Sequence, residues 1–146
     1  MRSSYDKAVE AIGRSAGGLS TKIHAKVDSF GQLVNSLLTP GQVHESQVAH
    51  EIFADEGCEF FLADKAYDID AFRQSLDKKG ITSVIPSKRN RLNPTTYDYH
   101  IYKERNIVER FFQKIKRFRR IATRYDKTAR MYLTGVMFVS ILLALK

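Results

Sequence analysis

The order of strand and helix signals is the feature that most restricts the fold of this chain. Polar and apolar residues alternate over residues 21–28, and a second apolar segment covers residues 33–38 after a short turn, which predicts a β-hairpin. The apolar run at residues 60–63 predicts a strand buried on both faces, and residues 82–85 predict a further short strand. Helical segments separate and follow these last two strands. This interleaving indicates an α/β fold with a mixed sheet flanked by helices.

The two ends of the chain differ in composition. Residues 1–20 are small, polar and rich in glycine, so we expect an irregular lead-in before a domain that covers residues 21–146. Residues 131–146 are mostly apolar, but they are fewer than the roughly twenty apolar residues that a membrane span needs. We therefore expect a buried closing helix and no membrane partner. The alternative is a small membrane-associated protein whose basic helix lies on anionic lipid.

Cysteine and histidine residues are few. The single cysteine, Cys58, excludes an internal disulfide framework and suits the reducing cytoplasm. The four histidines are scattered and lack the spacing of zinc ligands. No charged-then-apolar signal peptide opens the chain, so we expect a cytoplasmic protein.

Positive charge is concentrated in one segment. The chain holds 24 Lys and Arg against 16 Asp and Glu, and residues 103–130 hold eleven of these cations and three of these anions. The whole net charge of +8 therefore lies on this segment. A localised basic stripe is typical of a surface that binds a polyanion, whereas a merely solvated helix normally mixes its signs. The loop at residues 87–96 adds Lys88, Arg89 and Arg91 to the candidate surface.

One carboxylate stands within the predicted basic helix at residues 102–120. At about 100° per residue, a single arc of about 60° holds Tyr102, Arg105, Glu109 and Lys116, and the apolar side chains fall on another face. Glu109 could form a surface ion pair with Arg105. It could also be a ligand of Mg²⁺, which prefers few carboxylates together with water and substrate phosphate. The pattern by itself leaves both interpretations open.

A second carboxylate, Asp64, ends the apolar run at residues 60–63. Open α/β sheets display catalytic groups at such strand ends, although an aspartate there can also cap a turn. Two acids from different elements, beside a basic helix, favour metal-assisted phosphoryl transfer.

These motifs resemble those of bacterial insertion-sequence transposases of the DDE type. The spacing of Tyr102, Arg105, Glu109 and Lys116 is similar to the Y-R-E-K signature of that family, and LADKAYD at residues 62–68 resembles its second-aspartate motif. The stretches LLTPGQVHE, VIPSKRN and ERFFQKIKRFRRIATRYDK resemble the family in the same order. The closest likeness is to the insertion-sequence-five group of the four/five type. The resemblance implies a ribonuclease H-like fold and DNA transposition.

The resemblance also implies roles for particular residues. Asp64 and Glu109 would be the second and third catalytic acids and the ligands of Mg²⁺ or Mn²⁺. A two-ion site is expected only if the family's first aspartate is supplied. The residues implied to bind DNA phosphates are Tyr102, Arg105, Lys116, Arg110, Arg117 and Arg120.

The family's first aspartate has no counterpart in the sequence. It lies on the first strand of the fold in a D-S-T type motif, and neither Asp6 nor Asp28 matches that motif. We therefore expect the C-terminal part of a transposase, lacking the first strand and inactive alone. Its expected partners are transposon-end and target DNA, an upstream transposase polypeptide and, when active, further copies of itself. The alternative is a catalytically dead DNA-binding remnant or a regulator of transposition.

Overall fold

The computed structural model describes residues 9–53 and 57–146, which divide into two compact units. Unit 1 comprises Met1–Val43 and Ile107–Lys146, and unit 2 comprises His44–Asn106. Unit 1 carries 15 Lys and Arg against five Asp and Glu, whereas unit 2 carries nine against 11. The net charge is therefore +10 for unit 1 and −2 for unit 2.

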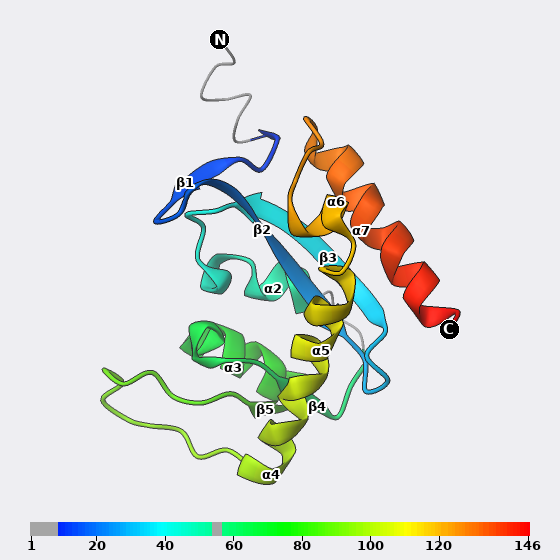
Figure 1. Cartoon of the computed structure of the whole chain (residues 1–146). Coiled ribbons are helices and arrows are strands. Elements are labelled where there is room, and N and C mark those ends of the chain that lie inside the picture. The colour runs from blue at the N-terminus through cyan, green and yellow to red at the C-terminus, as the bar shows by residue number, and fades with distance from the viewer. Residues whose placement is uncertain (1–8, 54–56) are drawn as a thin grey trace. The chain divides into compact units, whose positions relative to one another are not determined.

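Unit 1 is built on a three-stranded antiparallel sheet in the order β1-β2-β3 (Figure 1). Its strands are β1 (Gly13–Ser15), β2 (Gly18–Val27) and β3 (Leu33–Pro40). The register places Ile23 opposite Leu38 and Ala25 opposite Ser36, so alternate residues face the core as the pattern predicts. The turn between β2 and β3 includes Gly31, whose φ of 79° favours glycine. The predicted hairpin is thereby confirmed.

The glycine-rich beginning of the chain differs from the expected irregular lead-in. Residues 13–15 pair with residues 18–20, so residues 13–20 of this segment form a second, tighter hairpin. Gly18 has a φ of 106°, so its lack of a Cβ permits the turn here. The glycines that suggested an irregular segment therefore permit a tight turn between two paired strands. Residues 1–8 of the predicted lead-in lie outside the described residues.

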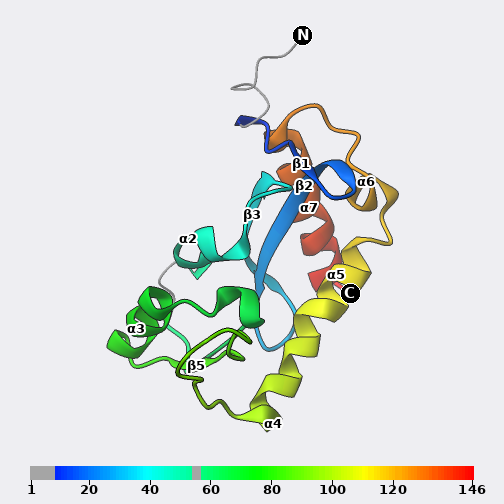
Figure 2. The same cartoon turned by 90° about the vertical axis from the view of Figure 1, so that its left-hand side faces the viewer.

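The helices of unit 1 pack on one face of the β2–β3 hairpin. They are α5 (Asn106–Ile115), α6 (Arg119–Ala122) and α7 (Ala129–Ala144). Figures 1 and 2 both show α7 lying alongside this hairpin. The side chains of Phe111, Ile115, Tyr132 and Val136 form the centre of this core and contact apolar residues of both strands. The predicted single helix over residues 102–120 is instead interrupted, because Phe118 has an extended backbone (φ −83°, ψ 111°) and is the N-cap of α6.

The closing helix α7 is buried on one side only. Tyr132, Val136 and Val139 face the core, whereas Phe138 and Ile141 are exposed. The expectation of a buried closing helix is therefore correct for one face of α7. No helix in residues 9–53 and 57–146 has the length and hydropathy that a membrane span requires.

Unit 2 contains a two-stranded parallel sheet, β4 (Phe60–Leu62) and β5 (Thr82–Val84), joined through helix α3 (Asp70–Lys78). Phe72 and Leu76 of α3 are fully buried and pack with residues that flank both strands. This arrangement is a short βαβ unit, so the predicted mixed α/β character is confirmed. The remaining elements are η1 (Glu45–Gln47), α2 (Ala49–Phe53), η2 (Lys65–Tyr67), α4 (Tyr99–Tyr102) and η3 (Lys103–Arg105).

Candidate active site

Asp64 is the second residue after β4, separated from the strand by the buried Ala63. Its Oδ1 accepts a hydrogen bond from the backbone N–H of Ala66 at 2.9 Å and so caps η2. The residue is partly exposed, and its second carboxylate oxygen makes no hydrogen bond within the described residues. The capping interpretation is therefore correct. It also leaves one oxygen available as a ligand.

The charge of Asp64 influences its neighbour Tyr67. Burial raises the pKa of the Tyr67 phenol to about 12, and the carboxylates of Asp64 and Glu45 act in the same direction. The phenol is therefore a neutral donor at physiological pH. Asp64 thus follows β4 and lies near the half-buried phenol of Tyr67.

Tyr102 and Arg105 are the predicted phosphate-binding residues that lie in unit 2. The Arg105 guanidinium lies 5.7 Å from the ring centroid of Tyr102, and the Tyr97 ring packs edge-on against Tyr102 at 5.3 Å. The backbone is right-handed helical at Tyr102, Lys103 and Asn106, so the helical winding continues into α5. The stacking holds both side chains on this helical segment.

Glu109 and the remaining predicted residues belong to unit 1. Glu109 is exposed in the first turn of α5, where the helix dipole favours a carboxylate. Arg110, Lys116 and Arg117 are also exposed, and the Lys116 ammonium lies 5.9 Å from the ring centroid of Phe112. Asp64 therefore lies in unit 2 and Glu109 in unit 1.

Arg120 is already paired. Its guanidinium donates to both carboxylate oxygens of Asp126, at 2.6 Å and 3.1 Å. This hydrogen bond holds the pKa of Asp126 below its ordinary value. The Arg120 side chain nevertheless remains 59% exposed, so it can still meet a phosphate from solvent.

Arg124 has a structural role within the basic segment. Its Nη1 donates to the carbonyl oxygen of Glu10 at 2.8 Å and to Oγ1 of Thr21 at 2.6 Å, and its Nε donates to the carbonyl oxygen of Asp126 at 3.0 Å. The guanidinium also lies 5.4 Å from the ring centroid of Tyr132. Arg124 therefore joins the segment before α7 to the beginning of the sheet, and the basic stripe is not uniformly available to DNA.

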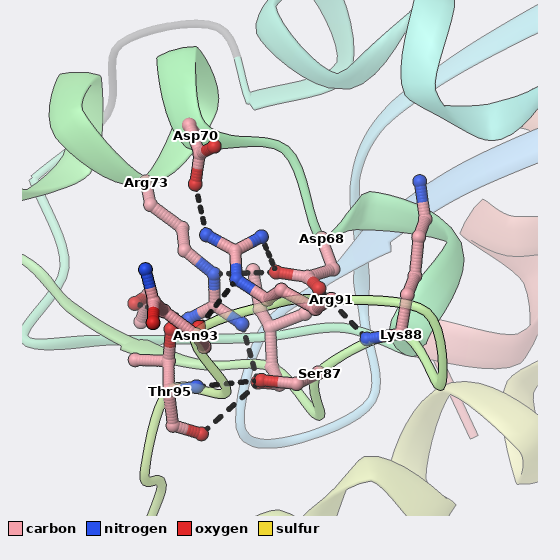
Figure 3. Close-up of polar contacts among 10 residues, drawn as sticks. Asp68, Asp70, Arg73, Ser87, Lys88, Arg91, Asn93 and Thr95 are labelled. Carbon is pink, nitrogen blue, oxygen red and sulfur yellow. Dashed lines mark hydrogen bonds and ion pairs between the residues drawn. The ribbon is translucent and has the colours of Figure 1, made fainter.

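Asp68, which no sequence prediction assigned to a site, is the centre of a buried ion cluster (Figure 3). Its Oδ1 accepts from Nε of Arg73 at 2.8 Å and from Nη1 of Arg91 at 2.9 Å, and its Oδ2 accepts from the backbone N–H of Lys88 at 2.8 Å. Burial alone would raise the pKa of Asp68. The Lys88 N–H and the two guanidinium groups outweigh it and hold that pKa below its ordinary value.

Helix α3 begins after Ile69, which contributes no side-chain hydrogen bond to the helix N-terminus. The one sequence feature that pointed to Asp68 was its place as the last residue of the LADKAYD motif.

Among residues 9–53 and 57–146, no group of three or more His, Cys, Asp and Glu side chains is placed to hold a metal ion. Asp64 and Glu109 are only two carboxylates, one fewer than the smallest group of that kind.

Comparison with known proteins gives the family. Residues 11–143 match the family model of the transposase DDE domain, so this chain belongs to the DDE transposase family, as its motifs predicted. It is 37% identical over 112 residues to a putative transposase for insertion sequence element IS6501 from Brucella ovis. The match covers 75% of this chain and 86% of that relative. No solved structure matches the chain.

Proposed function

We propose that this chain takes part in DNA transposition as the portion of a DDE transposase that carries the second and third catalytic acids. The reaction is the cutting and joining of DNA phosphodiesters. The observation that carries the proposal is the position of Asp64 two residues after β4, with one carboxylate oxygen available, within the residues 11–143 that match the family model. The concentration of positive charge on unit 1 supports DNA as the partner.

The proposed fold is ribonuclease H-like. It is supported by the element order, in which antiparallel strands β1–β3 precede a parallel pair, β4 and β5, that is joined by a helix. In this proposal the strand that bears the first aspartate is supplied by an upstream transposase polypeptide. Asp28 is not assigned to its place, because Asp28 does not match the D-S-T type motif; its Oδ1 accepts hydrogen bonds from the backbone N–H groups of Phe30 and Gln32, both at 2.9 Å, and so holds the turn after β2.

Asp64 and Glu109 have the ligand chemistry that Mg²⁺ or Mn²⁺ prefers. Both are carboxylates, each comes from a separate element, and each is at least partly exposed to solvent. The chemistry that divalent ions supply in such a site is activation of the attacking oxygen and stabilisation of charge on the leaving oxygen. In the proposal both acids hold those ions, and the family's first aspartate comes from the upstream polypeptide.

The basic residues bind and orient the DNA. Arg105 and Lys116 hold the reacting phosphate and oppose negative charge that develops on it, and the Tyr102 hydroxyl donates to a phosphate oxygen. Arg110, Arg117 and Arg120 bind the DNA backbone without reading the bases. Unit 1 brings the larger share of these cations.

The decisive experiment reconstitutes the reaction. The 146-residue chain is incubated with transposon-end DNA and Mg²⁺, with and without the upstream polypeptide, and strand transfer is measured. We expect DNA binding by the chain alone and strand transfer only in the reconstituted mixture. Asp64→Ala and Glu109→Ala should each abolish transfer in that mixture, whereas the exposed control acids Asp77→Ala and Glu104→Ala should leave it unchanged.

Mg²⁺-dependent strand transfer by the chain alone would contradict the incomplete site. Full transfer by both alanine variants would remove the assignment of Asp64 and Glu109. DNA binding with no transfer under any condition would favour the second candidate function, a DNA-binding regulator of transposition. The charge difference between the units favours that candidate independently of catalysis.

A further inference from the structure

The long connection between β5 and α4 is held at several points although it has no regular secondary structure. Oγ of Ser87 accepts from the backbone N–H of Thr95 at 2.7 Å and donates to the carbonyl oxygen of the same residue at 3.3 Å, so the two ends of residues 87–95 are joined. Inside this loop, Nε of Arg91 donates to the carbonyl oxygen of Asn93 at 3.1 Å. Loops of this length within a compact unit are usually functional.

Asp68 and Arg91 attach this loop to the body of unit 2. The Asp68 carboxylate is fully buried and receives both the Lys88 N–H and the Arg91 guanidinium. Arg91 also donates to Asp70 in the first turn of α3. A buried carboxylate is stable only when donors surround it, so withdrawal of the loop would leave Asp68 with Arg73 alone.

The same carboxylate is close in sequence to the candidate metal ligand. Asp68 ends the turn that Asp64 begins, and its backbone N–H donates to the carbonyl oxygen of Lys65 at 3.2 Å. One buried residue therefore joins the Asp64 turn, helix α3 and the loop at residues 87–95.

The basic residues of the loop are of two kinds: Arg91 is paired inside the Asp68 ion cluster, whereas Lys88 and Arg89 are outside it. Two carboxylates, Asp68 and Asp70, face two guanidinium groups, Arg73 and Arg91, so the cluster is balanced. The Arg91 side chain is only 19% exposed, and its Nε, Nη1 and Nη2 all donate to protein oxygens.

Lys88 and Arg89 are the two basic residues of the loop that lie outside the ion cluster. Within the part of the chain that the structure describes, neither side chain takes part in an ion pair, and Arg89 is exposed. The Lys88 side chain stays outside the network of contacts in Figure 3.

We propose that residues 87–95 form a preformed phosphate-binding loop, in which Lys88 and Arg89 bind the DNA backbone and Asp68 and Arg91 are positioning residues. The inference rests on the proposed function, because it takes DNA as the partner. Holding the loop in one conformation before DNA arrives removes the entropy loss of ordering it on binding. Arg91, which the sequence suggested as a DNA ligand, acts through the loop and does not touch the phosphate.

The first test uses the protein without DNA. Hydrogen exchange of the Lys88 and Thr95 amides is measured by NMR in the whole chain, in Arg91→Ala, in Asp68→Asn and in the control Arg89→Ala. We expect both amides to exchange at least tenfold faster in Arg91→Ala, with chemical shifts of the Phe72 core unchanged, and at the wild-type rate in Arg89→Ala. Arg91→Ala is the primary variant because Asp68→Asn leaves the buried Arg73 without a carboxylate. Unchanged exchange in Arg91→Ala would overturn the positioning role.

The second test is a double-mutant cycle on binding of a short duplex DNA, measured by fluorescence anisotropy over a range of salt concentrations. Lys88→Ala with Arg89→Ala should weaken binding and reduce the slope of log K against log salt by about 0.9 for each lost contact. Arg91→Ala should weaken binding several-fold in the wild-type background and have no further effect in the Lys88→Ala/Arg89→Ala background. Equal weakening by Arg91→Ala in both backgrounds would show that Arg91 touches DNA and would overturn the proposal.

The remaining outcomes separate the two proposals. If the wild-type chain binds DNA and Lys88→Ala/Arg89→Ala binds with the same affinity and salt slope, the loop proposal is wrong and the proposed function stands. If the wild-type chain does not bind DNA, both are wrong.

Discussion

Nη1 of Arg124 lies 2.6 Å from Oγ1 of Thr21, so a residue of the basic segment fixes the beginning of β2. The two residues are far apart in the sequence but share one unit. The basic segment therefore contains a cation that maintains the fold as well as cations that face solvent. This distinction separates stability from DNA binding in unit 1.

Replacing Arg124 should destabilise the chain without changing the salt dependence of DNA binding. Arg124→Ala removes hydrogen bonds from a charged donor to Thr21 and to the carbonyl oxygen of Glu10, a loss of about 2 kcal/mol in the free energy of unfolding. Urea-induced unfolding measures the effect. Wild-type stability of Arg124→Ala would contradict the structural role.

The exposed cation Arg117 should behave in the opposite way. Because Arg117 is exposed and has no carboxylate partner among the described residues, Arg117→Ala should leave the unfolding free energy within about 0.5 kcal/mol of wild type. It should reduce the slope of log K against log salt for DNA binding by about 0.9. Arg124→Ala is the matched comparison, and an unchanged slope for Arg117→Ala would place this side chain outside the DNA interface.

Asp68 should make a contribution to stability that persists at moderately acidic pH. Burial would raise its pKa, but the Lys88 N–H and the guanidinium groups of Arg73 and Arg91 hold the pKa below its ordinary value of 3.8. A carboxyl group whose pKa is lower in the folded state stabilises the protein fully above its unfolded pKa, and it loses that contribution as the pH falls through its folded pKa.

The measurement is the difference in unfolding free energy between wild type and Asp68→Asn at several pH values. The difference should be constant between about pH 7 and 5 and should shrink below about pH 4. A difference that already falls between pH 7 and 5 would mean that the Asp68 pKa is raised in the folded protein.

Asp28 should matter for the turn and not for metal binding. Asp28→Ala removes the acceptor of the Phe30 and Gln32 N–H groups and should cost about 1 kcal/mol of stability. Asp28→Asn keeps an acceptor oxygen, so it should retain both stability and strand transfer in the reconstituted reaction. Loss of transfer in Asp28→Asn at unchanged stability would make Asp28 a metal ligand.

Periodicity predicted those parts of the fold in which side chains alternate along the chain. The Ile23 and Ala25 face of the hairpin was evident from local pattern, because burial of one face imposes alternation. The apolar run at residues 60–63 predicted strand β4, but its predicted burial on both faces is wrong, since Phe60 is exposed and Phe61 and Leu62 are half-buried. β1 was missed because its glycines permit a tight turn as readily as an irregular segment.

The ion cluster of unit 2 could not be predicted in the same way. Asp68 and Arg91 are 23 residues apart, and no local spacing indicates that two such residues meet. Arg124 was counted with the DNA-binding cations for the same reason, since its contacts to Glu10 and Thr21 are long-range. Charge composition gives the sign of a surface. The partners of each charge depend on tertiary structure.

The central claim is that Asp64 and Glu109 hold the same divalent ions, and paramagnetic broadening by Mn²⁺ tests it most directly. Amide resonances of the reconstituted protein are followed as Mn²⁺ is added, first in the wild type and then in Asp64→Ala. The account predicts that residues flanking Asp64 and residues flanking Glu109 broaden at the same Mn²⁺ concentration, and that Asp64→Ala weakens the broadening at both places. Broadening around only one of the two acids, or broadening near Glu109 that Asp64→Ala leaves unchanged, would contradict it.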